Sequence, residues 1–458
     1  MSRLANSLAA RDIAHLVHPQ TNLQRHLEQG PAIVDHASGV WIYDDEGNGF
    51  LDSVSGLWCA PLGFAPERLA RAAYEQMRKL SYAHLYRHNS HEPAIELAEK
   101  LLSIAPRSMS KVHFQSTGSE ANDVAIKLVW YYFNALGRPQ KRKIISRHGA
   151  YHGSTVAAVS LTGKPDMHAQ FNLPLDGFLH VACPHYFRDR RGDESEQAYA
   201  TRLADDLEAL IVEQDPDTVA AFFAEPVMGA SGAILPPESY FEKVQGVLRK
   251  YDILFVADEV ITGFGRTGKM WGCKTFAIQP DLMSCAKALS SGALPISALL
   301  MSEKIYQAML SQSERTGQFA HGHTYAGHPA CAAVALETLK IYEEMDLLAH
   351  ITGLSSCFAD MLDGIRDHPL VGDVDMTGLI AGIELVKDKG AGEQFPACMN
   401  AGVRVAEASR RHGLLHRYAG NRIAFAPAYI ISQDEIGEIG VRLRKSLDEV
   451  HGELCGNK

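Results

Sequence analysis

The sequence lacks several features that mark whole classes of protein. No stretch approaches the roughly 20 apolar residues that a membrane-spanning helix needs. Residues 1–20 contain no apolar run of signal-peptide length. Long basic runs are also missing, and the formal net charge of the 458 residues is -10. We therefore expect a cytoplasmic protein that binds neither a membrane nor nucleic acid.

Motifs for metals and dinucleotides are missing or incomplete. The eight cysteines are scattered and no two form a CxxC pair, which argues against a thiolate zinc site and against disulfides. Residues 263–268 match G-x-G-x-x-G, but no amphipathic helix follows and the acidic pair precedes the glycines, so we reject a nicotinamide site. His321 and His323 have no carboxylate at ligand spacing, so we expect no metal.

What is present is an ordinary globular composition, 46% hydrophobic and 21% charged, in a chain longer than one core usually serves. From about residue 111 to 301, apolar strands alternate with helices, which predicts an α/β domain with a mainly parallel sheet. Residues 165–200 are expected to be irregular. After residue 330 the alternation is lost, which favours α+β. We expect a large domain over 61–328 and a small domain formed by 329–458 with the N-terminal segment 1–60.

A lysine closes one of the predicted strands. Residues 281–286 are typical of a short buried strand, and Lys287 follows directly before a Ser/Gly turn. Buried lysines are rare unless they are paired or functional. Removal from water lowers the pKa of a lysine and makes its amine a nucleophile toward carbonyls. Lys287 is therefore the first candidate for a catalytic residue.

Small residues follow another predicted strand, over 111–115. Gly118 and Ser119 open a long helix there, where free N–H groups and the helix dipole suit an anion such as phosphate. The alternative is a helix without a ligand, with Ser119 as its N-cap. Tyr151 stands on a Gly-rich turn and could stack on a flat ring or remain a surface tyrosine. Trp58 is either a core residue or part of a pocket.

One ligand accounts for these groups together, a flat pyridine aldehyde with a phosphate arm. Lys287 would form an imine with the aldehyde, and Asp258, at the end of a strand 29 residues earlier, would keep the ring nitrogen protonated. Gly118 and Ser119 would cradle the phosphate. Tyr151 would cover one face of the ring. Val260, which lies two residues beyond Asp258 and so on the same side of the chain, would cover the other face.

The motifs that carry these groups occur in a characteristic order. They are FQSTGSEAN at 114–122, YHG at 151–153, AEPVMG at 224–229, VADEVITGFGRTG at 256–268, AKALSSG at 286–292 and HGHTYAGHP at 321–329. With these motifs the chain resembles the class III (fold type I) aminotransferases, in particular the ω-amino acid or amine:pyruvate transaminase branch, from about residue 15 to 450. The resemblance implies an enzyme, pyridoxal 5'-phosphate as cofactor, and the fold of a large, mainly parallel-sheet α/β domain with a smaller α+β domain.

The resemblance also assigns further cofactor residues and an assembly. It adds His152 and Glu225 to the cofactor site. It implies a homodimer, or a dimer of dimers, with active sites at the subunit interface. Thr324 and the backbone of His323 would reach the phosphate of the neighbouring subunit's cofactor.

Substrate residues are implied in the same way. Trp58 and Tyr151 would line the substrate pocket, and Arg417 would be a mobile arginine that clamps the carboxylate of pyruvate or alanine. Arg422 is a nearby rival for that role. The implied reaction moves the amino group of a primary amine or ω-amino acid to pyruvate and yields a ketone or aldehyde plus alanine. A 2-oxoglutarate-linked aminotransferase, an aminomutase of the same fold and a non-catalytic relative remain as alternatives.

Overall fold

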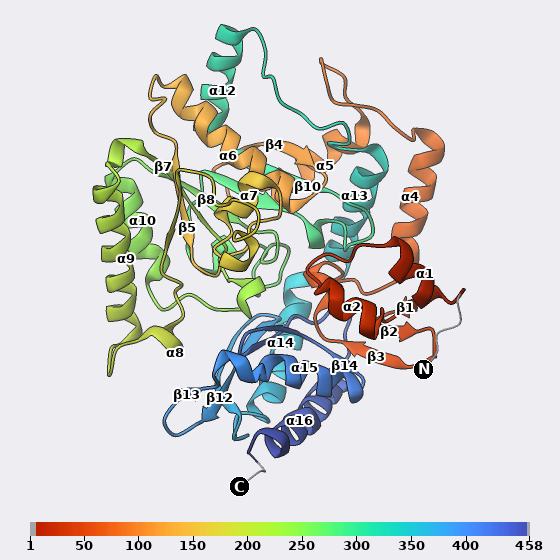
Figure 1. Cartoon of the computed structure of the whole chain (residues 1–458). Helices are drawn as coiled ribbons and strands as arrows, with labels where there is room; N and C mark the ends of the chain where they lie inside the picture. Colours follow the sequence, from red (N-terminus) through yellow and green to blue (C-terminus); the bar gives the residue numbers. More distant parts are fainter. Residues whose placement is uncertain (1–5, 456–458) are drawn as a thin grey trace.

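A computed structural model describes residues 6–455. Its centre is a seven-stranded sheet in the order β4-β10-β9-β8-β7-β5-β6 (Figure 1). The strands are β4 (Met109–Gln115), β5 (Lys143–Arg147), β6 (Phe178–Val181), β7 (Val219–Ala224), β8 (Leu254–Asp258), β9 (Leu282–Cys285) and β10 (Ser297–Ser302). Strands β9, β8, β7, β5 and β6 are mutually parallel, whereas β10 runs antiparallel to both of its neighbours. The expected mainly parallel sheet is therefore confirmed.

Helices cover both faces of this sheet, which explains why its central strands are apolar throughout. Every residue of β7 is buried, because alternate side chains enter different cores. One face packs against α6 (Gly118–Ala135), α7 (Val156–Leu161) and α12 (Glu303–Thr316). The other packs against α5 (Glu92–Ile104), α9 (Glu196–Glu213) and α10 (Tyr240–Lys250).

The C-terminal part forms separate sheets below this domain in the view of Figure 1. One has the order β11-β12-β16-β15, with β13 paired to β12, and the other has the order β1-β2-β3-β14. Because β14 pairs in parallel with β3, the N-terminal hairpin joins the C-terminal residues. The strands are β1 (Val34–Ser38), β2 (Trp41–Asp44), β3 (Gly49–Asp52), β11 (Val371–Thr377), β12 (Ile380–Asp388), β13 (Glu393–Gln394), β14 (Leu414–Leu415), β15 (Arg417–Ala419) and β16 (Arg422–Phe425).

The remaining helices link and cover these sheets. Helix α13 packs against α4 and α5, and α16 packs against α14 and α15. The domain boundaries at 60 and 328 stay predictions. These helices are α1 (Leu8–His15), α2 (Leu23–Gln29), α3 (Ser55–Trp58), α4 (Glu67–Lys79), α8 (Tyr186–Asp189), α11 (Gly272–Thr275), α13 (Pro329–Glu344), α14 (Leu347–Asp363), α15 (Ala401–Arg411) and α16 (Gln433–Cys455).

Two local expectations were wrong. The segment 165–200 is not wholly irregular, since it contains β6, a four-residue strand at the sheet edge that pairs with β5 alone. The N-cap of α6 is Thr117 rather than Ser119: the Thr117 hydroxyl accepts the N–H of Glu120, whose carboxylate in turn accepts the Thr117 N–H. This reciprocal capping box leaves Ser119 free for other contacts.

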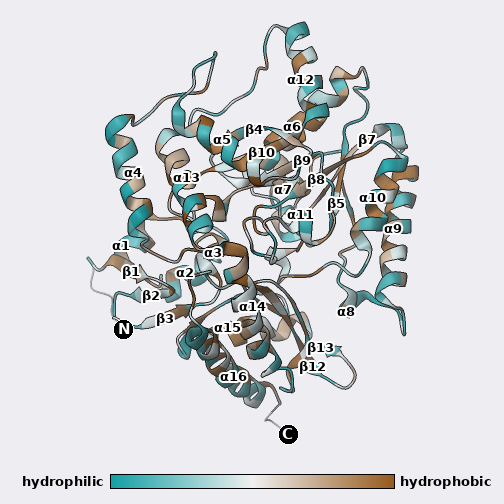
Figure 2. Cartoon of the chain, turned by 180° about the vertical axis from the view of Figure 1, so that it is seen from behind, coloured by the Kyte–Doolittle hydropathy of each residue, from teal (hydrophilic) through white to brown (hydrophobic). Residues whose placement is uncertain are grey.

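Outer helices such as α4 and α12 carry many teal, hydrophilic residues in the cartoon of Figure 2, whereas brown, hydrophobic residues are frequent in the strands of the central sheet. Within residues 6–455, no helix is both long enough and apolar enough to cross a membrane.

Candidate active site

Three adjacent parallel strands end at the same edge of the central sheet. Strand β7 runs into Glu225, β8 ends at Asp258, and β9 is followed after one residue by Lys287. In open parallel sheets this carboxyl edge is where ligands bind. The fold thus brings together three ionisable groups that are far apart in the sequence.

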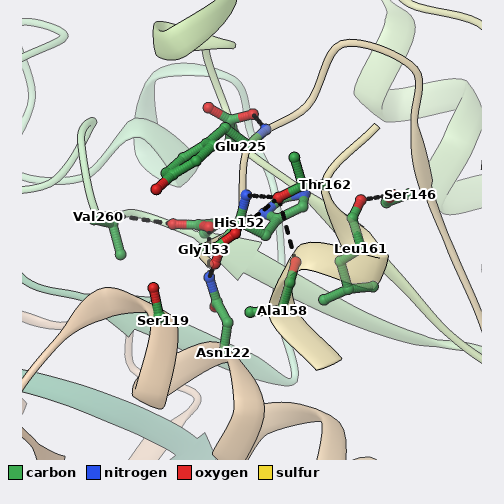
Figure 3. A network of polar contacts seen from close by, with 12 residues as sticks. Ser119, Asn122, Ser146, His152, Gly153, Ala158, Leu161, Thr162, Glu225 and Val260 are labelled. Atoms are coloured by element: carbon green, nitrogen blue, oxygen red, sulfur yellow. Dashed lines mark hydrogen bonds and ion pairs between the residues drawn. The ribbon is translucent and has the colours of Figure 1, made fainter. Parts of the chain in front are cut away.

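Asp258 is held in place by three donors. Its side chain is 4% exposed, and its Oδ2 accepts hydrogen bonds from Asn122 Nδ2 at 2.8 Å and from His152 Nδ1 at 2.8 Å. Its Oδ1 accepts the N–H of Val260 at 3.1 Å. Figure 3 shows Asn122, His152 and Val260, which come from three different segments, close to one another. A carboxylate with this many donors is oriented and kept ready to accept a further proton-bearing group.

The start of α6 lies beside this carboxylate. The Ser119 Oγ accepts the N–H of Ser154 at 3.1 Å, which ties the helix to the turn after His152. A Cβ on Gly153 would approach Ser119 Oγ to 2.6 Å, and one on Gly118 would approach Val260 Cγ1 to 3.1 Å. A side chain at 153 would clash with Ser119, and one at 118 would require Val260 to move by a few tenths of an ångström. The N–H groups of Gly118 and Ser119, in the first turn of α6, have no acceptor four residues earlier within the helix and can donate to an anion.

Glu225 supports the neighbouring turn. Its carboxyl group is almost fully buried and accepts the N–H of Tyr151 at 3.1 Å and that of Gly229 at 3.2 Å. Burial raises the pKa of Glu225, and the nearby His152 opposes the shift. Glu225 therefore fixes the backbone that presents the half-buried Tyr151.

Lys287 has a strained backbone and a perturbed amine. Its φ of 50° lies in the left-handed region, which costs a non-glycine residue about 1–3 kcal/mol. Burial lowers the pKa of its amine, although the charge of Asp258 opposes this. Its Nζ lies 5.6 Å from the centroid of the Trp58 ring. The lysine is therefore held in one direction, with an amine that loses its proton more readily than an exposed one.

The Trp58 ring lies close both to this lysine and to an arginine. The Trp58 side chain is 6% exposed, and the guanidinium carbon of Arg417 lies 5.7 Å from its ring centroid. Arg417 itself is exposed on β15. Arg422 differs completely: it is 0% exposed, donates to the carbonyls of Gly232 and Ala233, and pairs with Asp375 at 2.6 Å.

His323 and Thr324 stand apart from this cluster. Among the described residues, neither makes a hydrogen bond to Lys287 or Asp258. The Thr324 carbonyl accepts the hydroxyl of Tyr82 at 2.9 Å, and the His323 ring lies 5.0 Å from that of His321. The structure of one chain thus leaves both on a loop outside the cluster.

Asn122 is the residue that sequence reasoning missed. It donates both to Asp258 and to the His152 carbonyl and is 1% exposed. It lies four residues after Gly118, one helical turn further on the same side of α6. That spacing was the one available signal: it places Asn122 on the side of α6 that carries Gly118, but it does not indicate Asp258 as the partner.

The residues fit a pyridine aldehyde with a phosphate arm. A buried amine, an oriented carboxylate and a helix start with close-fitting glycines match its three functional parts. Several buried polar atoms have no partner within the described chain, including Trp58 Nε1, Asn122 Oδ1 and His152 Nε2. Such atoms are expected where a polar ligand belongs.

Comparison with known proteins assigns the family. Residues 23–447 match the family model for class-III aminotransferases. The chain is 44% identical over 457 residues to "Gamma aminobutyrate transaminase 3, chloroplastic" of Solanum lycopersicum, covering 98% of this chain and 88% of that protein. It superposes with a TM-score of 0.97 on the ω-transaminase of Pseudomonas jessenii in complex with PMP, at 47% identity and with 99% and 100% of the two chains covered. A transaminase solved with L-alanine superposes with a TM-score of 0.90 at 46% identity, covering 92% of this chain and 100% of that chain.

These matches span nearly the whole chain, including all three of its sheets, so the expected fold type I and pyridoxal-phosphate chemistry are confirmed. The chain belongs to the class-III aminotransferases, enzymes that transfer amino groups with pyridoxal 5'-phosphate.

Proposed function

We propose that this aminotransferase moves the amino group of a primary amine or ω-amino acid to pyruvate, giving a ketone or aldehyde plus alanine. The observation that carries the proposal is the arrangement of Arg417, Trp58 and Lys287. Both cationic groups lie against one indole ring, at 5.7 and 5.6 Å from its centroid. A small keto acid could therefore place its carboxylate on Arg417 while its carbonyl approaches the lysine end of the pocket.

The contacts described above support an assignment of the cofactor site. Asp258 would accept the proton-bearing ring nitrogen, Tyr151 and Val260 would cover the two ring faces, and Gly118 and Ser119 would bind the phosphate. Bound pyridoxal phosphate supplies an aldehyde that carries the amino group and a ring that takes up electrons from the substrate. His152 and Glu225 would act by positioning, the first on Asp258 and the second on the Tyr151 turn.

Lys287 would do the proton transfer. Its Nζ would hold the cofactor at rest and, once an amine displaces it, take the proton from the substrate carbon that bears nitrogen. A base for this step works best with a pKa near the working pH, and burial moves the pKa of Lys287 in that direction.

The relatives support an amino acid donor and an alanine product. One is named for γ-aminobutyrate, an ω-amino acid, and another was solved with L-alanine, the product that pyruvate would give. Arg417 would then serve the carboxylate of the ω-amino acid in one half-reaction and that of pyruvate in the other.

We also propose that two chains form a dimer in which His323 and Thr324 serve the partner's cofactor phosphate. Exposed aromatic residues beside this loop support the proposal, since Tyr82 and Tyr325 are 41% and 64% exposed in the single chain. Light scattering of the purified holoenzyme measures the assembly, and a monomer would rule it out. Cytoplasmic location stays a prediction.

The test of the reaction is a donor and acceptor panel. Holoenzyme is incubated with γ-aminobutyrate, 1-phenylethylamine or a diamine, each with pyruvate or with 2-oxoglutarate, and alanine and glutamate are quantified. We expect alanine to form faster than glutamate. Faster glutamate formation would replace pyruvate by 2-oxoglutarate as acceptor, and no product from any pair would exclude transamination of these donors.

A further inference from the structure

Three side chains near the N-terminus converge on one point, outside the site described above. Asp12 lies in α1, His26 in α2 and His18 in the segment between them. The His18 Nε2 lies 3.0 Å from both carboxylate oxygens of Asp12, and the His26 Nε2 lies 3.1 Å from Asp12 Oδ1. The two imidazole rings are 4.3 Å apart between centroids. All three candidate ligand atoms lie within 4.8 Å of one another.

These separations match the edges of a metal coordination polyhedron. Zinc binds imidazole nitrogen and carboxylate oxygen at about 2.0–2.2 Å, which places neighbouring ligand atoms about 3.0–3.5 Å apart. The Nε2-to-oxygen distances of 3.0 and 3.1 Å need little or no outward movement to reach that range. The two imidazole nitrogens lie within 4.8 Å of each other, which is wider than that range by at most about 1.3–1.8 Å.

The donor set selects the kind of ion. Two imidazoles and one carboxylate suit first-row divalent metals such as zinc, whereas magnesium and calcium prefer oxygen ligands throughout. The His26 and Asp12 side chains are 9% and 11% exposed, while His18 is 32% exposed. The cluster is therefore enclosed on one side and open on the other, which leaves room for water as a fourth ligand.

Local charge also permits a cation. Arg25, next to His26 in sequence, is directed at Glu407, with 3.6 Å between its Nη2 and the carboxylate. A simpler account of the geometry is two imidazole N–H groups donating to one carboxylate. That account requires no ion. A measurement of metal binding therefore distinguishes a metal site from a hydrogen-bonded cluster.

We propose that Asp12, His18 and His26 bind one zinc-like divalent ion and that this ion tethers α1 to α2. The sequence predicts no metal, because the three ligands are 6 and 8 residues apart and come from two helices and a connector, a spacing that belongs to no short motif. The site is independent of the cofactor and of the proposed acceptor.

The experiment measures bound zinc in the full-length, untagged holoenzyme. After equilibrium dialysis against Zn²⁺, we expect wild type to retain one more equivalent per chain than His26→Gln or Asp12→Asn, with binding at this site at least about tenfold weaker in each variant. Excess Mg²⁺ or Ca²⁺ should not displace it. Co²⁺ should give visible absorption bands in wild type that the variants lack.

His36→Gln is the matched control, because His36 forms an exposed pair with Asp35 at 2.8 Å and has no third ligand nearby among residues 6–455. It should retain the wild-type zinc content. A second measurement follows the tether itself. Trypsin cleavage at Arg11 and Arg25 depends on local opening, and Zn²⁺ at 100 times its Kd should lower the open fraction about a hundredfold in wild type only. Equal zinc content in wild type and His26→Gln, or equal loss in His36→Gln, overturns the proposal.

Discussion

Asn122 and Asp258, 136 residues apart in sequence, meet at the centre of the site, with 2.8 Å between Asn122 Nδ2 and Asp258 Oδ2. The same amide nitrogen also donates to the His152 carbonyl at 2.7 Å, and the His152 ring donates to the same Asp258 oxygen. The orientation of the carboxylate therefore depends on two groups that would not touch the substrate. Asn122 is a positioning residue for Asp258.

Replacing Asn122 should weaken catalysis through Asp258. In Asn122→Ala one donor to a buried carboxylate is lost, which is worth about 1–3 kcal/mol. We expect kcat/KM for any good amine donor to fall about tenfold to a hundredfold. We also expect the pH dependence of the cofactor absorbance to shift, because a less well held Asp258 stabilises the protonated ring nitrogen less.

Asn134→Ala is the control for this change, because Asn134 is exposed on the same helix. It should keep both kcat/KM and the absorbance profile. A purely structural role of Asn122 would lower the melting temperature while the absorbance of the remaining folded holoenzyme keeps its wild-type pH profile.

The lowered pKa of Lys287 makes a prediction for the apoprotein. Burial depresses the pKa in the folded state, so the unfolded chain binds more protons between that lowered value and the ordinary lysine value of about 10.4. Stability should therefore rise with pH in this window, and below it the folded state should bear the full cost of the buried charge. Urea unfolding of apoprotein at several pH values measures the slope.

The comparison is made with Lys287→Met, which removes the titrating amine. The difference in unfolding free energy between wild type and this variant should move in favour of wild type as pH rises. The exposed Lys340 provides the control, and Lys340→Met should track wild type. A pH-independent difference for Lys287→Met would show that the folded state does not perturb this amine.

The central sheet could be predicted because each of its main strands is a short run of apolar residues in the sequence. Strands β7, β8 and β9 are buried on both faces, and the polar residues that end them mark the carboxyl edge. The positions of Lys287 and Asp258 at strand ends then suggested their proposed roles, and the family resemblance added His152 and Glu225. The antiparallel direction of β10 and the existence of β6 were not predictable, since both depend on pairing with distant segments.

Polar contacts between residues far apart in the chain could not be predicted from the sequence either. Nothing local to Asn122 indicates that it will face Asp258, and Arg417 and Arg422 have similar neighbours in the sequence. Only the fold separates the two arginines: one is exposed on β15 and the other is buried on β16. The Asp12 cluster is hidden for the same reason, because tertiary folding alone brings α1 and α2 together.

Arg417→Ala should act on carboxylate substrates alone. Loss of the guanidinium removes charge-assisted hydrogen bonds to pyruvate, and we expect its KM to rise at least about tenfold. The first half-reaction with 1-phenylethylamine, which has no carboxylate, should keep its rate. Arg410, an exposed arginine that also lies over an aromatic ring, 4.6 Å from the Phe50 centroid, is the control, and Arg410→Ala should change neither value.

Arg422→Met should act on stability instead. The change leaves Glu384 without one of its cationic neighbours in a site where it is 0% exposed, and it leaves Asp375 without a partner at 2.6 Å. Breaking a buried ion pair from one side costs about 3–5 kcal/mol. We expect a lower urea midpoint, measured by far-UV circular dichroism, with an unchanged KM for pyruvate in the folded enzyme. A raised KM without destabilisation would transfer the carboxylate role from Arg417 to Arg422.

Trp58 should set the size of the amine that the pocket accepts. Its ring centroid lies within 5.7 Å of both Lys287 Nζ and the guanidinium carbon of Arg417, so Trp58→Leu opens volume beside the reacting amine without removing either charged group. We expect the ratio of kcat/KM for a bulky aryl amine to that for a small amine to rise several-fold, since pocket contacts of this kind are worth about 1–3 kcal/mol. Trp271 is the matched control, because it is 0% exposed but donates to the Ile104 carbonyl outside the site. Trp271→Leu should lower stability and leave the ratio unchanged, whereas an equal ratio in wild type and Trp58→Leu would place the size limit elsewhere.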